Sequence, residues 1–317
     1  MTHGLSFHIP KHKLYAMNRI ILIPILLLMS SAFMFSQDRV LNIIAIGAHP
    51  DDCDYKFGGT AALFAKMGHN VKFLALTSGD AGHQSQGGGA LGNRRRAEAA
   101  EAARRLGIAE YETLDNHDGE LMPTLHVRHQ VIRAIREWDA DIVLGLRSND
   151  YHPDHRNAGK VVMDASYMVI VPNVCPDTPP LDKNPLFLYM QDRFQKPYPH
   201  TPDVVVAIDD VIEMKVDALD AHVSQMYEWG PWTNGGDASV AKVPTGKEER
   251  RAWLSKNLKR NAGRMSDARR TSLESWYGKD IADNVQFTEA FEIAEYGYQP
   301  SKEDLLNFFP MLKPIKP

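Results

Sequence analysis

The 317-residue sequence has few cysteines, little excess charge and only one long apolar run. Its two cysteines are too few for a disulfide-stabilised scaffold. Because 36 basic residues face 40 acidic ones, a net charge of -4, the bulk charge gives no reason to expect nucleic acid as a partner. Hydrophobic residues make up 44% of the chain, which excludes disordered, collagen-like and coiled-coil proteins. The composition is that of an ordinary globular protein.

The apolar run lies near the start of the chain. Residues 20–29 read IILIPILLLM, follow Arg19 and precede small residues. That order is typical of an export signal, and the proline inside the run disfavours a membrane-spanning helix. We expect residues 1–36 to be a signal peptide; Met17 is an alternative start that would make residues 1–16 an artefact. The protein is therefore expected to be periplasmic or secreted, and to touch a membrane only if the signal stays uncleaved.

Strand-like and helix-like segments alternate after the signal. The expected strands are 41–47, 71–77, 111–114, 141–146 and 204–209, and the expected helices are 58–68, 94–107, 125–138, 156–168 and 210–226. This alternation predicts a Rossmann-like α/β fold, a mostly parallel sheet with helices on both faces and right-handed crossovers. We expect one domain over 37–228, with 229–317 as its C-terminal extension, and the proline-rich stretch 172–202 as a long surface loop.

Two similar tetrapeptides follow two of the expected strands. HPDD (49–52) comes directly after the first, and HPDH (152–155) a few residues after the strand at 141–146. Open α/β sheets bind ligands at the carboxyl ends of their strands, and a strand order of 3-2-1-4 would bring both motifs to one crevice. A single His-Pro-Asp is typical of a plain turn. Two of them, each followed by another potential ligand, favour a functional site.

The residue types in these motifs suit a metal ion. Imidazole and carboxylate groups bind Zn²⁺, and a catalytic zinc keeps three protein ligands. His49, Asp52 and His155 satisfy that count for one Zn²⁺ per chain. Fe²⁺, Co²⁺ and Mn²⁺ tolerate the same ligands.

The remaining motif residues have the chemistry of acid–base catalysis. Asp51 is a carboxylate beside the ligands that is free to act as a general base toward water. His152 is suited to protonating a leaving group or stabilising an oxyanion, with Asp154 to orient it.

At these motifs the sequence resembles the PIG-L/LmbE-like zinc-dependent N-acetylglucosaminyl deacetylases. The resemblance extends over about 41–226 and rests on a set of short motifs: AHPDD (48–52), HPDH (152–155), Thr77-x-Gly79, Arg95-x-x-Glu98, Asp118-Gly119 and the segment 202–225. Together these motifs are highly specific for the family.

The resemblance implies a role for each matching residue. His49, Asp52 and His155 would hold the metal, Asp51 would be the general base, His152 would lie near the tetrahedral intermediate, and Arg95 and Asp118 would contact sugar hydroxyls. The implied reaction removes the acetyl group from an N-acetylated amino sugar or glycan, releasing acetate and leaving an amine.

Several alternatives stay open. The chain could instead be a non-catalytic amino-sugar-binding protein of the same fold, or a hydrolase of a different acyl amide; the intact Asp51 and His152 argue against a mere binder. Export would permit a disulfide between Cys53 and Cys175. Trp229 and Trp232 are suited to a sugar-stacking wall or to packing under the extension. The sequence does not define the sugar, the metal, the oligomeric state or the role of 229–317.

Overall fold

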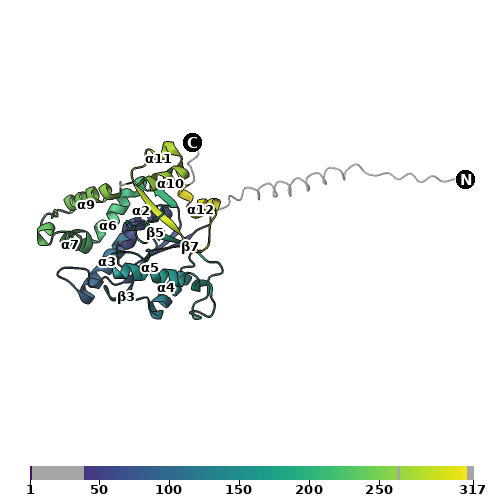
Figure 1. Cartoon of the computed structure of the whole chain (residues 1–317), viewed down its shortest axis with the longest axis horizontal. Coiled ribbons are helices and arrows are strands. Elements are labelled where there is room, and N and C mark those ends of the chain that lie inside the picture. Colours follow the sequence, from purple (N-terminus) through teal and green to yellow (C-terminus); the bar gives the residue numbers. More distant parts are fainter. Residues whose placement is uncertain (2–38, 263–264, 313–317) are drawn as a thin grey trace. The chain divides into compact units, whose positions relative to one another are not determined.

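A seven-stranded sheet with the order β3-β2-β1-β4-β5-β7-β6 forms the centre of the protein (Figure 1). Its strands are β1 (Asn42–Gly47), β2 (Asn70–Thr77), β3 (Glu110–Asn116), β4 (Ile142–Gly145), β5 (Leu186–Met190), β6 (Val204–Ala207) and β7 (Thr288–Gly297). Neighbouring strands run parallel from β3 to β5, whereas β7 is antiparallel to both of its neighbours. The expected α/β fold and the 3-2-1-4 strand order are confirmed.

This computed structural model describes residues 1, 39–262 and 265–312. Residues 40–317 form one compact unit, which contains every strand of the sheet. Beyond Met1, the expected signal segment lies outside the described residues. Among the helices that are described, none has the length and apolar character needed to cross a membrane.

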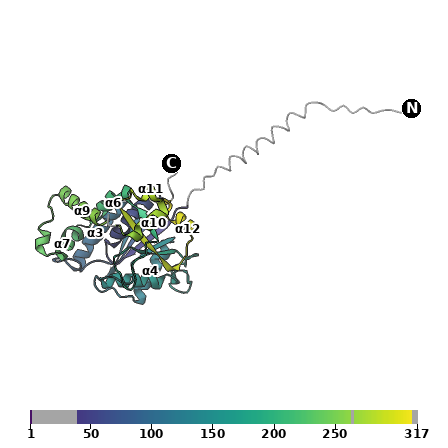
Figure 2. The same ribbon diagram turned by 45° about the horizontal axis from the view of Figure 1, so that its top comes forward.

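Helices cover the sheet in two groups. The α-helices are α2 (Asp52–Lys66), α3 (Gly88–Leu106), α4 (Leu125–Glu137), α5 (Pro153–Ala165), α6 (Ile212–Ala221), α7 (Gly230–Thr233), α8 (Asp237–Val240), α9 (Lys247–Ala262), α10 (Asp267–Tyr277), α11 (Lys279–Ala282) and α12 (Lys302–Phe308). Helices α2, α3 and α6 pack on one another, and α4 packs on α5. Figures 1 and 2 show α6 and α9 toward one side of the strands and α4 toward the other.

Helix α2 begins at Asp52, six residues before the expected start, so the HPDD motif opens this helix. Gly58 and Gly59, which resemble a helix boundary in the sequence, lie inside it. A Cβ atom on Gly59 would come within 2.9 Å of the Ile208 side chain, so glycine at this position allows α2 to pack closely against the segment after β6. Close packing, not a helix end, explains Gly59.

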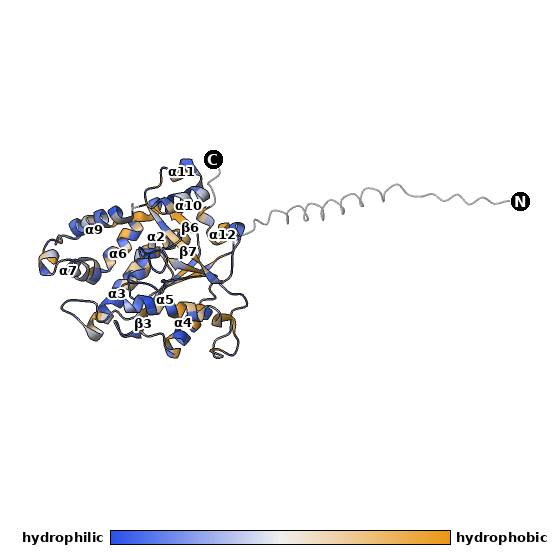
Figure 3. Cartoon of the chain, viewed as in Figure 1, coloured by the Kyte–Doolittle hydropathy of each residue, from blue (hydrophilic) through white to orange (hydrophobic). Residues whose placement is uncertain are grey.

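The expectation of a surface loop over 172–202 is wrong in its middle. Residues 186–190 form the buried strand β5, which pairs in parallel with β4. The segment 229–317 also reaches the centre of the fold, because its strand β7 lies between β5 and β6. Helix α9 of the same segment is mostly hydrophilic (Figure 3), yet it buries Leu254 and Leu258.

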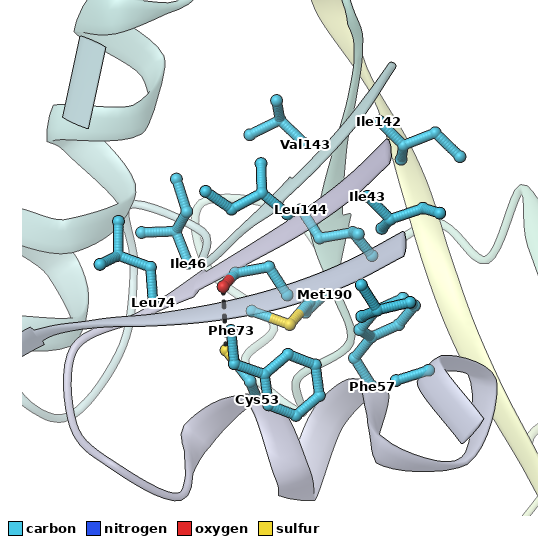
Figure 4. Packing of buried hydrophobic residues seen from close by; sticks show 14 of the residues in the cluster. Ile43, Ile46, Cys53, Phe57, Phe73, Leu74, Ile142, Val143, Leu144 and Met190 are labelled. Carbon is cyan, nitrogen blue, oxygen red and sulfur yellow. Dashed lines mark hydrogen bonds between the residues drawn. The ribbon is translucent and has the colours of Figure 1, made fainter. Parts of the chain in front are cut away.

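Both cysteines are free and buried, so they do not form the disulfide that export would permit. The Cys53 thiol donates a hydrogen bond of 3.4 Å to the carbonyl oxygen of Ala45, within the apolar cluster drawn in Figure 4. Burial raises the pKa of this thiol well above its usual value, so it remains protonated. Cys53 therefore packs as a small apolar residue of the core.

A buried ion pair connects β7 to two helices. One carboxylate oxygen of Glu289 lies 2.6 Å from Lys215 Nζ on α6. The two oxygens also accept hydrogen bonds from the backbone N–H groups of Gly59 and Thr60 on α2. This single carboxylate thus links the C-terminal strand to the rest of the fold.

We expect Lys215→Met to lower the free energy of unfolding by about 3–5 kcal/mol, because it leaves the Glu289 charge buried without its cation. Urea unfolding followed by circular dichroism measures the loss. Lys279→Met is the matched control, since that lysine forms an exposed pair with Asp283 and its loss should cost less than about 1 kcal/mol. Equal destabilisation by the two variants would contradict the structural role of the buried pair.

Candidate metal centre

The two His-Pro-Asp motifs meet at one edge of the sheet. The HPDD motif follows β1, the HPDH motif begins α5 after β4, and β1 pairs with β4. His152 is the N-cap residue of α5, where its Nδ1 accepts a hydrogen bond of 3.2 Å from the backbone N–H of Asp154. The prediction that residues about a hundred positions apart share a crevice is confirmed.

Three potential ligand residues converge within this crevice. His49 Nδ1 lies 3.2 Å from His155 Nε2. The carboxylate of Asp52 lies 3.3 Å from His155 Nε2 through one oxygen and 3.8 Å from His49 Nδ1 through the other. The backbone N–H groups of Ala48 and His49 hold this carboxylate in place, each at 2.9 Å.

The other nitrogen of each imidazole ring faces a carboxylate. His49 Nε2 lies 2.9 Å from Asp118 Oδ1 and 3.4 Å from Asp154 Oδ2, and His155 Nδ1 lies 3.1 Å from Asp150 Oδ1. These carboxylates accept, so the outer nitrogens carry the ring protons. The inner nitrogens, His49 Nδ1 and His155 Nε2, then present lone pairs to each other and to Asp52. Three such groups facing one another are stabilised by positive charge between them, which a metal ion or a proton can supply.

This donor set fits a metal ion of the zinc type. Two imidazole nitrogens and one carboxylate oxygen leave a coordination position open, as in catalytic zinc sites. Carboxylates behind the histidines are the usual means of fixing ring orientation in such sites. Among the described residues, two groupings have one ligand atom from each residue within 4.8 Å of one another: His49 with His152 and His155, and His49 with Asp118 and Asp154.

The surrounding charges favour a cation. Burial by itself lowers the pKa of His49, but its hydrogen bonds to Asp118 and Asp154 and the charge of Asp52 outweigh burial and raise this pKa to about 10. Burial likewise opposes ionisation of Asp52, but the charges of His155 and His49 hold its pKa at about 2. The crevice therefore stabilises positive charge among ionised carboxylates.

The backbone of Asp51 is strained, and neighbouring side chains hold both its backbone N–H and its carboxylate. Its φ of 143° lies in a region that residues other than glycine rarely adopt, and such outliers cluster at functional sites. Its backbone N–H donates to Tyr111 Oη at 2.8 Å, and that hydroxyl donates to Asp54 at 3.0 Å. Arg95 Nη2 lies 3.3 Å from the Asp51 carboxylate. Burial raises the pKa of Asp51 and the charge of Arg95 opposes that rise.

Tyr111→Phe should lower kcat by about tenfold with little change in KM, because it removes the acceptor that holds the Asp51 backbone. Steady-state kinetics measure both constants. Tyr277→Phe is the control, since Tyr277 accepts a similar hydrogen bond from the backbone N–H of Ala207 on β6, outside the crevice. A fall in stability without a fall in kcat would reduce Tyr111 to a structural residue.

Arg95 and Asp118 contact two residues of the HPDD motif directly. The Arg95 side chain is buried and donates to the carbonyl oxygens of Gly79 and Pro50 as well as to Asp51. Asp118 bonds the histidine ring described above and is also buried. Both residues also line the cavity, so the expected contacts to sugar hydroxyls stay a prediction.

Asp154 does not orient His152 through its carboxylate, contrary to expectation. Its oxygens accept hydrogen bonds from the backbone N–H groups of Gly119 and Leu121, and one of them faces His49. The carboxylate is engaged by the loop that follows β3, so only the backbone N–H of Asp154 reaches His152. Burial lowers the pKa of His152, as do the charges of the two neighbouring histidines.

Sequence reasoning missed Asp150, Asp54 and Tyr111. Asp150 precedes α5, and its carboxylate bonds the imidazole ring of His155, five residues later. Helical spacing does not reveal this contact, and only the position of Asp150 in SNDYHPDH indicates a role. Asp54 continues the HPDD motif and also lies 3.2 Å from His222 Nε2. Tyr111 belongs to β3, and only the strand order places it beside the motif.

The crevice opens into a cavity of about 940 Å³, which we call the histidine cavity. This volume is at the upper end of the range for small-molecule sites. Besides the motif residues, its wall includes Tyr151, which is 72% exposed, and Trp229 from a π-helical turn over Ser224–Trp229. Trp232 stacks on Trp229 with ring centroids 5.3 Å apart. Of the two tryptophans, only Trp229 reaches the cavity wall.

An ion-pair cluster holds the loop between β2 and α3 beside this cavity. Glu228 accepts two hydrogen bonds from Arg94, at 2.7 and 2.8 Å, and lies 2.8 Å from His83 Nε2. The glycine-rich stretch that follows this loop forms the start of helix α3, which begins at Gly88.

The fold and the crevice define a Rossmann-like α/β protein with a candidate metal centre at the point where the strand order reverses. The chain belongs to the PIG-L family, described as GlcNAc-PI de-N-acetylase, which matches residues 44–166. It is 32% identical over 200 residues to the diacetylchitobiose deacetylase of Thermococcus kodakarensis, a match that covers 61% of this chain and 74% of that protein.

Solved structures agree on the fold. The N,N′-diacetylchitobiose deacetylase of Pyrococcus horikoshii is similar with a TM-score of 0.60 and 25% identity, covering 91% of this chain and 95% of that chain. GalB, the 4-carboxy-2-hydroxymuconate hydratase of Pseudomonas putida, gives a TM-score of 0.62 at 18% identity, covering 83% of this chain and 99% of that one. The second likeness concerns the fold alone, so the chemistry has to be argued from the crevice.

Proposed function

We propose that this protein is a metal-dependent de-N-acetylase that hydrolyses the acetamide group of an N-acetylated amino sugar or glycan. The observation that carries the proposal is the convergence of two imidazoles and a carboxylate beside the strained, half-buried Asp51. Family membership and the deacetylases among its relatives support it.

His49, Asp52 and His155 would hold one metal ion, with Zn²⁺ preferred on ligand type and Fe²⁺, Co²⁺ or Mn²⁺ compatible. Asp118, Asp150 and Asp154 would keep the two imidazole rings in the binding tautomer. A bound Zn²⁺ supplies a Lewis acid that polarises the amide carbonyl and makes water easier to deprotonate.

Asp51 would accept the proton of the attacking water as general base. Burial favours that uptake by raising the pKa of its carboxyl, and Arg95 keeps the carboxylate in place. The same carboxyl group, once protonated, is one source of the proton that the departing amine requires.

His152 would face the oxygen on which negative charge develops. Since its Nδ1 accepts the backbone N–H of Asp154, the ring proton resides on Nε2, which is left to donate to the substrate. Tyr151 and Trp229 in the cavity wall offer flat surfaces for a sugar ring. In this scheme Arg95 and Asp118 act on Asp51 and His49 and touch the sugar only at the cavity wall.

The proposal places this chemistry outside the cytoplasm, because residues 20–29 have the pattern of an export signal. Fractionation of the source cells with N-terminal sequencing tests this: the mature chain should begin near Gln37 in an exported fraction. An intact N-terminus in the cytoplasm would contradict export.

Acetate release by the purified protein tests the reaction. N-acetylglucosamine, N-acetylgalactosamine and diacetylchitobiose form the first panel, each with and without a chelator. We expect acetate and a free amine in equal amounts from at least one sugar, and their loss with chelator. A metal-loaded protein that releases acetate from none of them would favour a different acyl group or a binding protein.

A further inference from the structure

A second cavity adjoins the histidine cavity. It encloses about 670 Å³, and we call it the basic chamber. Seven residues line both cavities: Tyr55, Gln191, Gln225, Met226, Gly230, Asn234 and Arg269. Together the two cavities offer more space than one sugar residue needs.

The two cavities differ in charge. Aspartates line the histidine cavity, whereas the wall of the basic chamber contains no acidic residue and has four basic ones, Lys215, Lys242, Arg260 and Arg269. Glu289 neutralises Lys215. Across residues 39–262 and 265–312, no carboxylate forms an ion pair with Lys242, Arg260 or Arg269. The chamber therefore has a positive wall.

Arg269 and Thr288 indicate where a ligand would bind. Arg269 lies at the junction of both cavities and is half-buried; burial lowers the pKa of its guanidinium, and the charge of Glu289 opposes that fall. Thr288, from β7, has a buried hydroxyl that lacks a hydrogen-bond partner among the described residues. An unpaired buried hydroxyl costs free energy unless a hydrogen-bond partner reaches it, and a half-buried guanidinium beside it can donate to the same acceptor.

We propose that the basic chamber binds an anionic group of the substrate, a carboxylate, sulfate or phosphate on the residue next to the N-acetylated sugar. A guanidinium is the side chain best matched to such groups, because it donates two parallel hydrogen bonds. The inference rests on the proposed function, since it assigns the neighbouring part of the same substrate. The substrate class is then an acidic amino-sugar glycan.

The test compares charged and uncharged forms of one substrate on the metal-loaded protein. The first pair is a disaccharide of glucuronic acid and N-acetylglucosamine and its methyl ester, and the second is a sulfated N-acetylglucosamine disaccharide and its unsulfated form. We expect kcat/KM to be about tenfold or more higher for the charged member of at least one pair. The pair with the larger ratio identifies the anionic group.

Arg269→Gln should bring that ratio close to one. Arg104→Gln is the matched control, because Arg104 has a 72% exposed side chain on α3 and lies outside both cavities, and it should leave the ratio unchanged. Ratios near one in the unmodified protein, or a ratio that Arg269→Gln does not change, would overturn the inference while deacetylation stands.

Calorimetric binding of the same pairs separates this inference from the proposed function. If no acetate is released but the protein prefers the charged disaccharide and Arg269→Gln removes the preference, the anion-binding role of the basic chamber is confirmed. The proposed de-N-acetylase function is then wrong. Equal binding of the charged and uncharged forms would overturn the chamber whatever the catalytic result.

Discussion

Asp51→Asn is expected to lower kcat by about 10²–10⁴-fold while the protein keeps its metal. The amide has nearly the shape of the carboxylate and tolerates positive φ, so the strained backbone should survive the change. What is lost is the group that takes the proton of water. Metal analysis and steady-state kinetics on the same preparation measure the two effects separately.

Asp139→Asn provides the control for Asp51→Asn. Asp139 also has a positive φ, of 46°, but it is exposed on the turn between α4 and β4. It should leave both metal content and kcat unchanged. If Asp51→Asn loses the metal instead of the rate, Asp51 is a ligand and the division of roles within the HPDD motif is wrong.

His155→Ala is expected to remove the metal and, with it, activity. Loss of a direct ligand should weaken binding by more than the roughly 10–100-fold typical of residues that only orient a ligand. Asp150→Asn removes only the carboxylate behind the ring, so it should weaken binding within that smaller range. His126→Ala, an exposed histidine on α4, should bind metal normally. A fully loaded His155→Ala protein would exclude His155 from the metal centre.

The same measurement distinguishes the two ligand sets that share His49 and His155. In the proposed set Asp52 completes the site, and in the alternative set His152 does. Asp52→Ala should therefore lose metal, whereas His152→Gln should retain it and lose rate. The opposite pattern would transfer the ligand role to His152.

Much of the fold could be predicted because its signals are local. Strands β1, β2 and β4 are short apolar runs, and their alternation with helices predicts a parallel sheet. The strand order then brings the two His-Pro-Asp motifs together. Strand β5 was missed although 186–190 is an apolar run of strand length, because the prolines around it suggest a loop.

Strand β7 could not be found in this way, because its buried position depends on distant partners. Its sequence TEAFEIAEYG contains three glutamates, which normally indicate a surface strand. Glu289 is nevertheless fully buried, because Lys215 and two backbone N–H groups of α2 satisfy it. No local pattern reveals an ion pair between residues 74 positions apart.

The site was predicted in its residues and only partly in its contacts. Motif spacing identifies His49, Asp52 and His155, and the structure brings their ligand atoms together. The motif spacing does not reveal that Asp118 and Asp154 face His49, because those contacts depend on how the chain enters α5. Side-chain direction at helix starts is the information that the sequence lacked.

Metal reconstitution tests the central claim most directly. The protein is stripped with chelator, Zn²⁺ is added in fractions of one equivalent, and acetate release from an N-acetylated sugar is followed at each step. The account predicts no activity in the stripped protein, a linear rise, and a plateau at one metal per chain. Full acetate release from the stripped protein, or a plateau that survives loss of His155, would contradict it.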